Sequence, residues 1–269
     1  GKAELTVFSG VKNIFEKPLG NNYQTVVEFK SLKPCVELIG DGVIVPHTGD
    51  ILFPFKAVSL SGVDVRIIQI FENNIVQFLQ TNQLNGDQEI KRVGRVVYNN
   101  EVMLHSKDVI DYNTWNNFSL DLSKLIKTEP GAIYRVEISF RMKHSLYPGI
   151  DRNSIVDSNP YPRDPNESFD EPSEYYWDYY EDDSNYGENY NWEETNDPTK
   201  PSYYLANHKV ARNVLASDFG IIAKSGTNNE YFLAVTNLLT TEPISDVEIE
   251  FRNLQNQVLA TTKTNSEGL

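Results

Sequence analysis

The sequence has a single cysteine, fewer bases than acids and no long apolar run, and each shortage excludes a class of protein. Because Cys35 stands alone, the chain can form neither an intrachain disulfide nor a cysteine-rich zinc site. Lysine and arginine number 24 against 38 acids, for a net charge of −14, so we expect no nucleic acid partner. No apolar stretch approaches the ~20 residues of a membrane-spanning helix, so we expect no membrane span.

Local signatures of catalytic and metal sites are also missing. The four histidines, His47, His105, His144 and His208, lie far apart, and no two are spaced to share one helix face. Neither the nucleophile pattern G-x-S-x-G nor a glycine-rich phosphate loop occurs. We therefore expect no catalytic residue, no metal and no cofactor, although an active site built from distant residues stays an alternative.

Cys35 lies in the segment PCVEL, residues 34–38. An internal thioester joins a cysteine to a glutamine three residues on, and Leu38 stands at that position. We therefore interpret Cys35 as a small, half-buried hydrophobic residue in a strand. Methylamine, which opens thioesters, is expected to leave the mass of the chain unchanged.

The acidity is concentrated in residues 151–200. This stretch holds 15 acids and 3 bases, net −12, which leaves 23 acids and 21 bases, net −2, for the other 219 residues. It carries 7 of the 15 tyrosines and 2 of the 3 tryptophans, but Ile155 and Val156 are its only Ile, Val or Leu residues. Since it cannot build an aliphatic core, it is predicted to be an inserted loop or linker between folded parts.

The aromatic residues of this insert form a candidate interaction surface, because Tyr and Trp offer large contact areas at low entropic cost. The candidate residues are Tyr175, Tyr176, Trp177, Tyr179, Tyr180, Tyr186, Tyr190 and Trp192. Packing of these side chains onto the chain's own domains is the competing interpretation, and we favour it slightly. The calcium-loop pattern is absent, so a dedicated ion site is not expected among the carboxylates, while weak divalent-ion binding stays open.

Outside the insert, short alternating segments predict β-strands. Residues 132–140 (AIYRVEISF), 63–67 (VDVRI) and 247–251 (VEIEF) alternate apolar and polar side chains, as half-buried strands do. A turn at residues 226–229 predicts a hairpin. Short strands without alternating long helices favour antiparallel β-sandwiches over a parallel α/β sheet.

One stretch departs from this pattern. Ile75, Phe78 and Leu79 follow helical spacing, and Asn73 or Asn74 can cap the start. We predict a helical turn or two that crosses between sheets, and prefer this interpretation to a binding helix.

From residue 210 onward the chain resembles the bacterial α2-macroglobulin family, especially its envelope-exposed Bacteroidetes-type members. The segments that carry the resemblance are RNVLASDFGIIAK (212–224), LAVTNL (233–238), EP (242–243), QNQVLA (255–260) and TNSEG (264–268). Upstream segments that resemble the preceding macroglobulin domain are GVIVP (42–46), PFKAV (54–58), IFENN (70–74), FLQ (78–80) and GAIYRV (131–136). Many relatives place a cysteine where Thr199 stands, so a disulfide that anchors the insert is not expected here.

The resemblance implies an all-β chain of tandem antiparallel β-sandwich domains, macroglobulin-like or fibronectin-like, with a long acidic aromatic insert. The expected divisions are the closing strands of a preceding β domain (1–34), a macroglobulin-like sandwich (35–147), the acidic insert or linker (148–202) and a second macroglobulin-like sandwich (203–269). With 67 residues against about 100 for a complete sandwich, the last unit is expected either to be incomplete or to be completed by strands from elsewhere. The chain is thus expected to be a fragment of a longer polypeptide.

Family membership implies the function of a broad-range protease trap, in which cleavage of an exposed bait segment releases a conformational change that encloses the protease. The bait and any thioester are expected outside this chain, which would serve as scaffold. The implied partners are target proteases and a penicillin-binding protein or another envelope protein. The implied location is the periplasm or cell surface, with a lipid anchor on the parent and a role in host defence. A β-sandwich module that binds cell-surface carbohydrate or protein is the alternative function.

Overall fold

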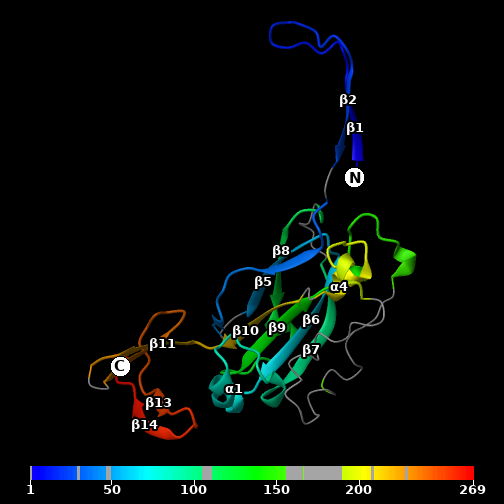
Figure 1. Cartoon of the computed structure of the whole chain (residues 1–269). Helices are drawn as coiled ribbons and strands as arrows, with labels where there is room; N and C mark the ends of the chain where they lie inside the picture. The colour runs from blue at the N-terminus through cyan, green and yellow to red at the C-terminus, as the bar shows by residue number, and fades with distance from the viewer. Residues whose placement is uncertain are drawn as a thin grey trace.

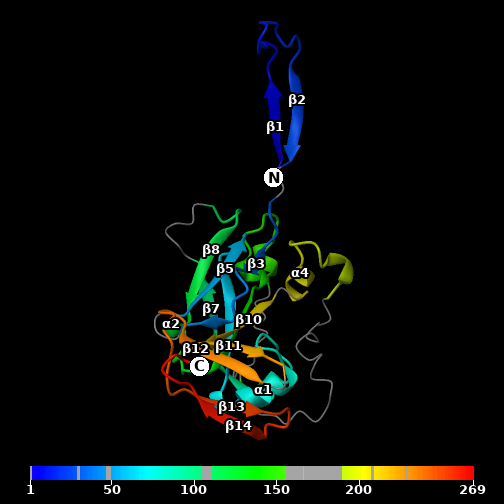
Figure 2. The same ribbon diagram turned by 90° about the vertical axis from the view of Figure 1, so that its left-hand side faces the viewer.

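The computed structural model describes residues 2–28, 31–46, 50–104, 111–155, 166, 190–206, 209–227 and 230–269. Among these residues strands predominate and every helix is short, so the all-β prediction is confirmed. Figures 1 and 2 show an N-terminal hairpin, a central pair of sheets and, at the other end, two C-terminal hairpins. Within the described ranges, no helix is both long and apolar enough to cross a membrane.

The larger central sheet has five strands in the order β4-β10-β9-β6-β7. These are β4 (Ile44–Val45), β10 (Val210–Ala216), β9 (Ile133–Ser139), β6 (Gly62–Ile70) and β7 (Gly94–Met103). Neighbouring strands are antiparallel, except that β4 runs parallel to β10. The strands predicted at residues 63–67 and 132–140 are confirmed as β6 and β9.

A three-stranded antiparallel sheet in the order β3-β5-β8 completes the central sandwich. Its strands are β3 (Cys35–Leu38), β5 (Leu52–Val58) and β8 (Asn116–Asp121). The apolar side chains of the predicted alternation fill the space between the sheets, since Val63, Val65 and Ile67 of β6 are fully buried in the core. Phe55 of β5 is also buried, and its ring stacks on that of Phe118 with centroids 5.6 Å apart.

Arg212 of β10 is a polar residue on the core side of the large sheet. It pairs with Val136, whose side chain belongs to the core, and only 6% of Arg212 is exposed. Its guanidinium lies 4.8 Å over the ring of Phe53 and donates hydrogen bonds to the carbonyls of Ile39 and Gly40. One buried cation therefore ties β10 to the chain that follows β3, and burial lowers its pKa.

The segment between β6 and β7 covers one end of the outer face of the five-stranded sheet. It contains η1 (Glu72–Asn74), α1 (Ile75–Thr81) and η2 (Ile90–Arg92). Phe78 of α1 is buried in a cluster with Ile70, Val93 and Ile133. The helix predicted from the spacing is thus confirmed, but it joins two adjacent strands of one sheet. The expected crossing between sheets is wrong.

Other helical turns fasten loops to the sandwich. They are α2 (Leu122–Leu125), η3 (Met142–His144), η4 (Arg152–Ser154), η6 (Trp192–Glu194) and α4 (Pro201–Leu205). Asp121, Asp151 and Asn191 cap α2, η4 and η6 by accepting backbone hydrogen bonds. Pro201 opens α4, where its missing N–H costs nothing.

The N-terminal hairpin pairs β1 (Lys2–Val7) with β2 (Tyr23–Glu28) and projects away from the sandwich (Figures 1 and 2). Several of its apolar side chains are exposed, among them Ile14 at 91% and Phe15 at 76%. A lone two-stranded hairpin is only marginally stable in water. That residues 1–34 close a preceding domain stays a prediction.

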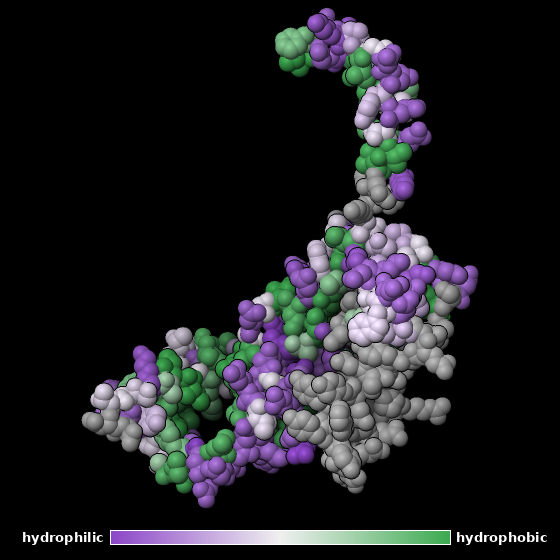
Figure 3. Space-filling model, in the orientation of Figure 1, coloured by the Kyte–Doolittle hydropathy of each residue, from purple (hydrophilic) through white to green (hydrophobic). Residues whose placement is uncertain are grey.

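The C-terminal part consists of two antiparallel hairpins that lie side by side. One pairs β11 (Phe219–Ser225) with β12 (Tyr231–Asn237), which confirms the predicted hairpin, and the other pairs β13 (Glu248–Arg252) with β14 (Val258–Lys263). Tyr231 and Phe251 bring the two hairpins together through rings 5.6 Å apart. Figure 3 shows apolar residues gathered on this part, where Ile221, Leu254 and Leu259 are 63% to 68% exposed.

The domain boundaries stay predictions, but the strand pairing bears on one of them. The predicted last unit includes residues 210–216, whereas β10 hydrogen-bonds to β9 and β4 inside the central sheet. Tyr203 and Val214 also belong to the central core. In the structure the central sandwich therefore extends to Ala216, and the two hairpins begin at Phe219.

Candidate functional site

Only two residues of the predicted interaction surface lie in the described part of the chain. Tyr190 and Trp192 meet edge to face, with ring centroids 5.2 Å apart and an angle of 84° between the planes. Trp192 is 76% exposed. The residues that lie outside the description are Tyr175, Tyr176, Trp177, Tyr179, Tyr180 and Tyr186.

The turn that presents Trp192 is anchored through Asn191. The side chain of Asn191 accepts a hydrogen bond of 3.0 Å from the Glu193 backbone, which caps η6. The backbone N–H of Asn191 donates to the hydroxyl of Ser202, a fully buried residue of α4, at 2.9 Å. An exposed indole on an anchored turn is a surface that a planar ligand can stack on.

Two tyrosines of α4 fix the end of the insert to the sandwich. Tyr203 is 5% exposed, and its hydroxyl donates to the Pro34 carbonyl at 2.8 Å. The Tyr204 hydroxyl lies 2.7 Å from the Pro198 carbonyl and 2.9 Å from the Ser145 hydroxyl. Burial raises the pKa of both phenols, that of Tyr204 to about 12. Both are therefore neutral at pH 7 and act as structural anchors.

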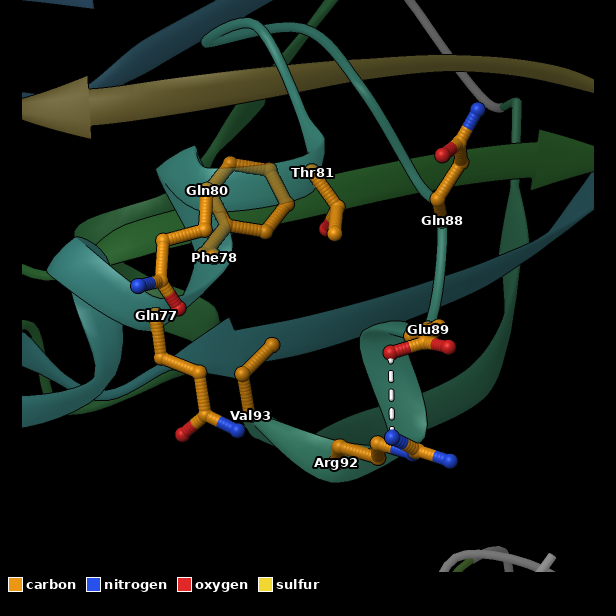
Figure 4. Close-up of a pocket in the computed structure, with 8 residues that line it drawn as sticks. All are labelled: Gln77, Phe78, Gln80, Thr81, Gln88, Glu89, Arg92 and Val93. Carbon is orange, nitrogen blue, oxygen red and sulfur yellow. Dashed lines mark ion pairs between the residues drawn. The ribbon is translucent and has the colours of Figure 1, made fainter. Parts of the chain in front are cut away.

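A small pocket of about 180 Å³ lies between α1 and η2 (Figure 4). Phe78 and Val93 contribute its apolar side, and the rest of the lining is polar. The polar lining residues are Gln77, Gln80, Thr81, Gln88, Glu89 and Arg92. The two charged ones, Glu89 and Arg92, already pair with each other at 3.2 Å.

The chemistry of this pocket is limited to hydrogen bonding. The residues that line it offer neither a nucleophile next to a base nor a set of metal ligands. The pocket is smaller and more polar than a usual small-molecule site. Gln80 also donates to the Leu254 carbonyl at 2.6 Å, so this side chain connects α1 to the C-terminal hairpins. A second hollow of about 290 Å³, between β7 and β8, is lined by residues without titratable side chains.

The structure brings together a cluster that the sequence did not predict. Asp64 of β6, Glu101 of β7 and His144 of η3 place one ligand atom each within 4.8 Å of one another. Asp64 and His144 are buried, 5% and 1% exposed. Arg141 binds both oxygens of Asp64, at 2.7 and 2.6 Å, and Lys143 binds Glu101 at 2.6 Å.

These contacts make the cluster a structural network and a poor cation site. The two carboxylates are balanced by two side-chain cations, Arg141 and Lys143, so little negative charge is left to attract a metal. His144 Nδ1 accepts a hydrogen bond from the Arg141 backbone at 3.1 Å, and Nε2 faces Glu101 at 3.3 Å. The ring is then the neutral Nε2–H tautomer, with no lone pair available as a ligand.

No sequence pattern predicts this cluster, because its members come from three separate segments of the chain. Alternation along β6 places Asp64 on the outer side, but only the register with β7 brings Glu101 opposite it. The η3 turn has Arg141 at its N-cap, so the usual sequence signal of a helical turn, a Ser, Thr, Asp or Asn at this position, is missing.

Cys35 lies in β3, half-buried, with its thiol 3.8 Å from the Val36 carbonyl. Burial, with Glu37 nearby, raises the pKa of this thiol. Since the thiolate is the nucleophile, a raised pKa makes Cys35 a poorer nucleophile at pH 7, in line with its interpretation as a small strand residue.

Comparison with known proteins supports the resemblance that the sequence carries. Residues 216–269 match the family model of the bacterial alpha-2-macroglobulin MG3 domain, which confirms the resemblance to this family. A search of curated proteins finds no match.

Solved structures show the same fold. The crystal structure of native alpha-2-macroglobulin from Escherichia coli spanning domains MG0-NIE-MG1 has a TM-score of 0.55 at 14% identity, over 99% of this chain and 66% of that one. The cryo-EM native conformation of the E. coli protein also gives 0.55 at 14%, over 99% of this chain and 13% of that one. The crystal structure spanning NIE-MG1 gives 0.50 at 13%, over 88% and 85%. The predicted macroglobulin-like β-sandwich fold is confirmed, and the chain spans only part of these relatives.

Proposed function

We propose that this chain, which is similar at its C-terminal end to the bacterial α2-macroglobulin MG3 domain, is a scaffold segment of a broad-range protease inhibitor. The observation that carries the proposal is the likeness in fold to native E. coli alpha-2-macroglobulin over 99% of the chain. In such a trap the bait segment and any thioester lie elsewhere in the parent. This chain supplies the sheets that hold the architecture before the bait is cut.

The chemistry of the described residues supports a scaffold over an enzyme. The buried carboxylates Asp64 and Glu137 are paired with arginines, the two hollows hold no nucleophile–base pair, and the single thiol is neutral. A trap needs none of these groups to react, because its work is a conformational change. We therefore propose that the chain has no catalytic activity.

The test uses the parent polypeptide that contains this chain, mixed with trypsin at equimolar ratio. A protease inside a cage still cleaves a small chromogenic peptide but cannot reach a large protein substrate. We expect hydrolysis of casein to fall at least tenfold while hydrolysis of the peptide is retained.

The matched control is the same parent whose bait segment resists trypsin, which is expected to leave casein hydrolysis unchanged. The isolated 269-residue chain should inhibit neither reaction. Inhibition of casein and peptide cleavage alike by the isolated chain would overturn the proposal, since that would be direct blockade of an active site.

The finer assignments are part of the same proposal. We place the parent in the periplasm or at the cell surface with a lipid anchor, and we expect target proteases as its partners, with a penicillin-binding protein or another envelope protein as a further one. Cell fractionation with and without mutation of the parent's lipid-attachment cysteine tests the location. Recovery of the parent in the cytoplasmic fraction alone would contradict it.

One observation favours the alternative of a carbohydrate-binding module. Trp192 is 76% exposed on an anchored turn and stands edge to face with Tyr190, and sugar rings stack on such indoles. Affinity electrophoresis in polysaccharide gels tests it. Retention that is lost in Trp192→Ala and kept in Trp115→Ala, a tryptophan 38% exposed elsewhere on the sandwich, would favour the module over the scaffold.

A further inference from the structure

The loop between α1 and η2 is fastened to the five-stranded sheet by one residue of β10. Asn213 is 1% exposed, and its side-chain amide donates to the Leu84 carbonyl at 2.8 Å and to the Gly86 carbonyl at 2.7 Å. The backbone N–H of Asn213 donates to the side-chain oxygen of Asn85 at 2.9 Å. Three hydrogen bonds from one buried residue therefore hold residues 84–86 against the edge of β10.

A second contact with the same loop comes from β9. The Arg135 guanidinium pairs with Asp87 at 2.6 Å and also donates to the side-chain oxygen of Asn213 at 3.3 Å. The side chain of Arg135 is 8% exposed, whereas that of Asp87 is 59% exposed. Because Arg135 binds both the loop and Asn213, the two contacts form one network.

The loop held by this network contains a reactive dipeptide. Asn85–Gly86 is the single Asn-Gly pair in the sequence, and Asn85 is exposed. Glycine has no Cβ to hinder its backbone nitrogen, so this nitrogen can attack the side-chain carbon of the preceding asparagine. The Gly86 nitrogen gives up its proton and bonds to Asn85 Cγ, the bond from Cγ to the side-chain nitrogen breaks, and ammonia leaves. Water then opens the resulting succinimide to aspartate or isoaspartate.

The contacts of the folded chain oppose the first step of this reaction. The Gly86 N–H donates to the Gln83 carbonyl at 2.8 Å, so the proton that must leave is engaged in a turn. The Asn85 side chain cannot rotate toward the Gly86 nitrogen without leaving the N–H of Asn213. A Cβ at residue 86 would also clash with the side-chain oxygen of Asn82, so the loop requires glycine there.

The products of the reaction do not fit the loop as the asparagine does. Isoaspartate lengthens the main chain by one methylene group, and both products place a negative charge two residues from Asp87. The Leu84 and Gly86 carbonyls lie on either side of residue 85, so Asn213 cannot keep its bonds to both of them once the backbone between them is longer. Formation of isoaspartate would therefore release the loop from β10.

We propose that Asn85 is a modification site at which the chain deamidates through a succinimide, and that Asn213 sets the rate by holding residues 84–86 closed. Water is the only reactant that the chain does not itself supply. Because the loss of ammonia is not reversed in water, the modified residue is a lasting record that the loop has opened. The inference does not depend on the proposed function.

The first test compares the folded and unfolded chain at pH 8. Peptide mapping by mass spectrometry follows the gain in mass as NH₂ is replaced by OH, and protein isoaspartate methyltransferase identifies isoaspartate. We expect Asn85 to deamidate about tenfold or more slowly in buffer than in 6 M guanidinium chloride, since only the open loop reacts. A synthetic peptide of residues 82–89 is the control and should match the unfolded chain. Equal rates in the folded and unfolded chain would overturn the proposal.

The second test loosens the loop without unfolding the chain. Asp87→Ala removes the exposed partner of Arg135, so we expect Asn85 to deamidate severalfold faster in the folded variant. Glu230→Ala, which removes the same charge from an exposed residue elsewhere, should leave the rate unchanged. A peptide of residues 82–89 with the Asp87→Ala change corrects for any effect on the intrinsic rate.

Asn213→Ala removes the bonds to both loop carbonyls and is expected to give the fastest reaction of the three variants. Melting curves show whether this buried substitution also unfolds the chain, and Asp87→Ala decides the question if it does. An unchanged rate in folded Asp87→Ala would overturn the proposal.

Discussion

At the scale of single residues, the phenol of Tyr203 is one of the groups that hold the end of the insert. The Tyr203 hydroxyl donates to the Pro34 carbonyl across 169 residues of chain, and its ring is part of the central core. Tyr203→Phe keeps the ring and removes the hydroxyl, so we expect the free energy of unfolding to fall by about 1 kcal/mol. Urea unfolding measures it. Tyr231→Phe, at a residue 61% exposed, should change nothing, and equal losses would contradict the anchoring role.

Burial of His144 is expected to make the stability of the fold depend on pH. Burial lowers its pKa and outweighs Asp64 and Glu101, which act in the opposite direction, while Arg141 and Lys143 add to the lowering. The unfolded chain therefore takes up a proton near pH 6.5 while the folded chain does not. Stability contributed by the neutral ring is complete above this pH and is lost as the pH falls below it.

The test compares the urea midpoints of the unmodified chain and His144→Asn from pH 7.5 to 5. We expect the midpoint of the unmodified chain to fall more steeply, because the variant has no imidazole to protonate at this position. Below pH 5 both should lose stability together, since the lowered pKa values of Glu101 and Glu137 stabilise the fold only while these groups are ionised. Parallel slopes above pH 5 would show that His144 does not titrate with unfolding.

The residue at position 38 determines whether Cys35 can form a thioester. Leu38 provides no carboxamide for a thioester, and the thiol is protonated at pH 7 because burial raises its pKa. Methylamine at pH 8 is expected to add no mass to the intact chain. A methylamine adduct together with a newly titratable thiol would contradict this.

At the scale of elements, α1 is stabilised by what it covers. Phe78 is 1% exposed beneath it, whereas Leu79 is 42% exposed on the same helix. Phe78→Ala should reduce the free energy of unfolding by about 3 to 5 kcal/mol, because it leaves a cavity over Ile70 and Ile133. Leu79→Ala is the matched control and should cost under ~1 kcal/mol. Similar losses in thermal or urea unfolding would mean that α1 is not seated as described.

The strands and helices also show which features of the fold a local sequence pattern can predict. Alternation predicted β6, β9 and β13, and helical spacing predicted α1, because apolar side chains recur in these segments at the period of the element that they form. The polar side chains of the alternation in β6 and β9 are buried nearly as well as the apolar ones, which the pattern did not predict. The parallel pairing of β4 with β10 joins Ile44 to Leu215, and no local signal encodes a partner 171 residues away. For the same reason the Asp64–Glu101–His144 cluster and the inward direction of Arg212 could not be read from the sequence. Charged residues in an alternating strand are expected to face water, and Arg212 faces the core because two backbone carbonyls lie opposite.

At the scale of the whole molecule, stability is expected to be uneven. β6 is buried along almost its entire length, whereas every residue of β14 is exposed. The N-terminal hairpin is a two-stranded sheet by itself. We expect hydrogen exchange to be fastest in β1 and β2, intermediate in β11 to β14, and slowest in β6 and β9. Uniform protection across the chain would instead indicate a single cooperative unit.

The junction between β10 and β11 determines how these parts communicate. Two residues, Ser217 and Asp218, separate the last residue of a central strand from the first strand of the C-terminal hairpins. The Ser217 N–H also donates to the Val45 carbonyl at 2.9 Å, which leaves almost no slack in this link. A pull on the hairpins would therefore load β10 along its length, against the ladder that pairs Val210 through Leu215 with β9. Because a pull along the strands loads many hydrogen bonds of this ladder at once, β10 is expected to stay paired and to transmit the force to the rest of the sandwich.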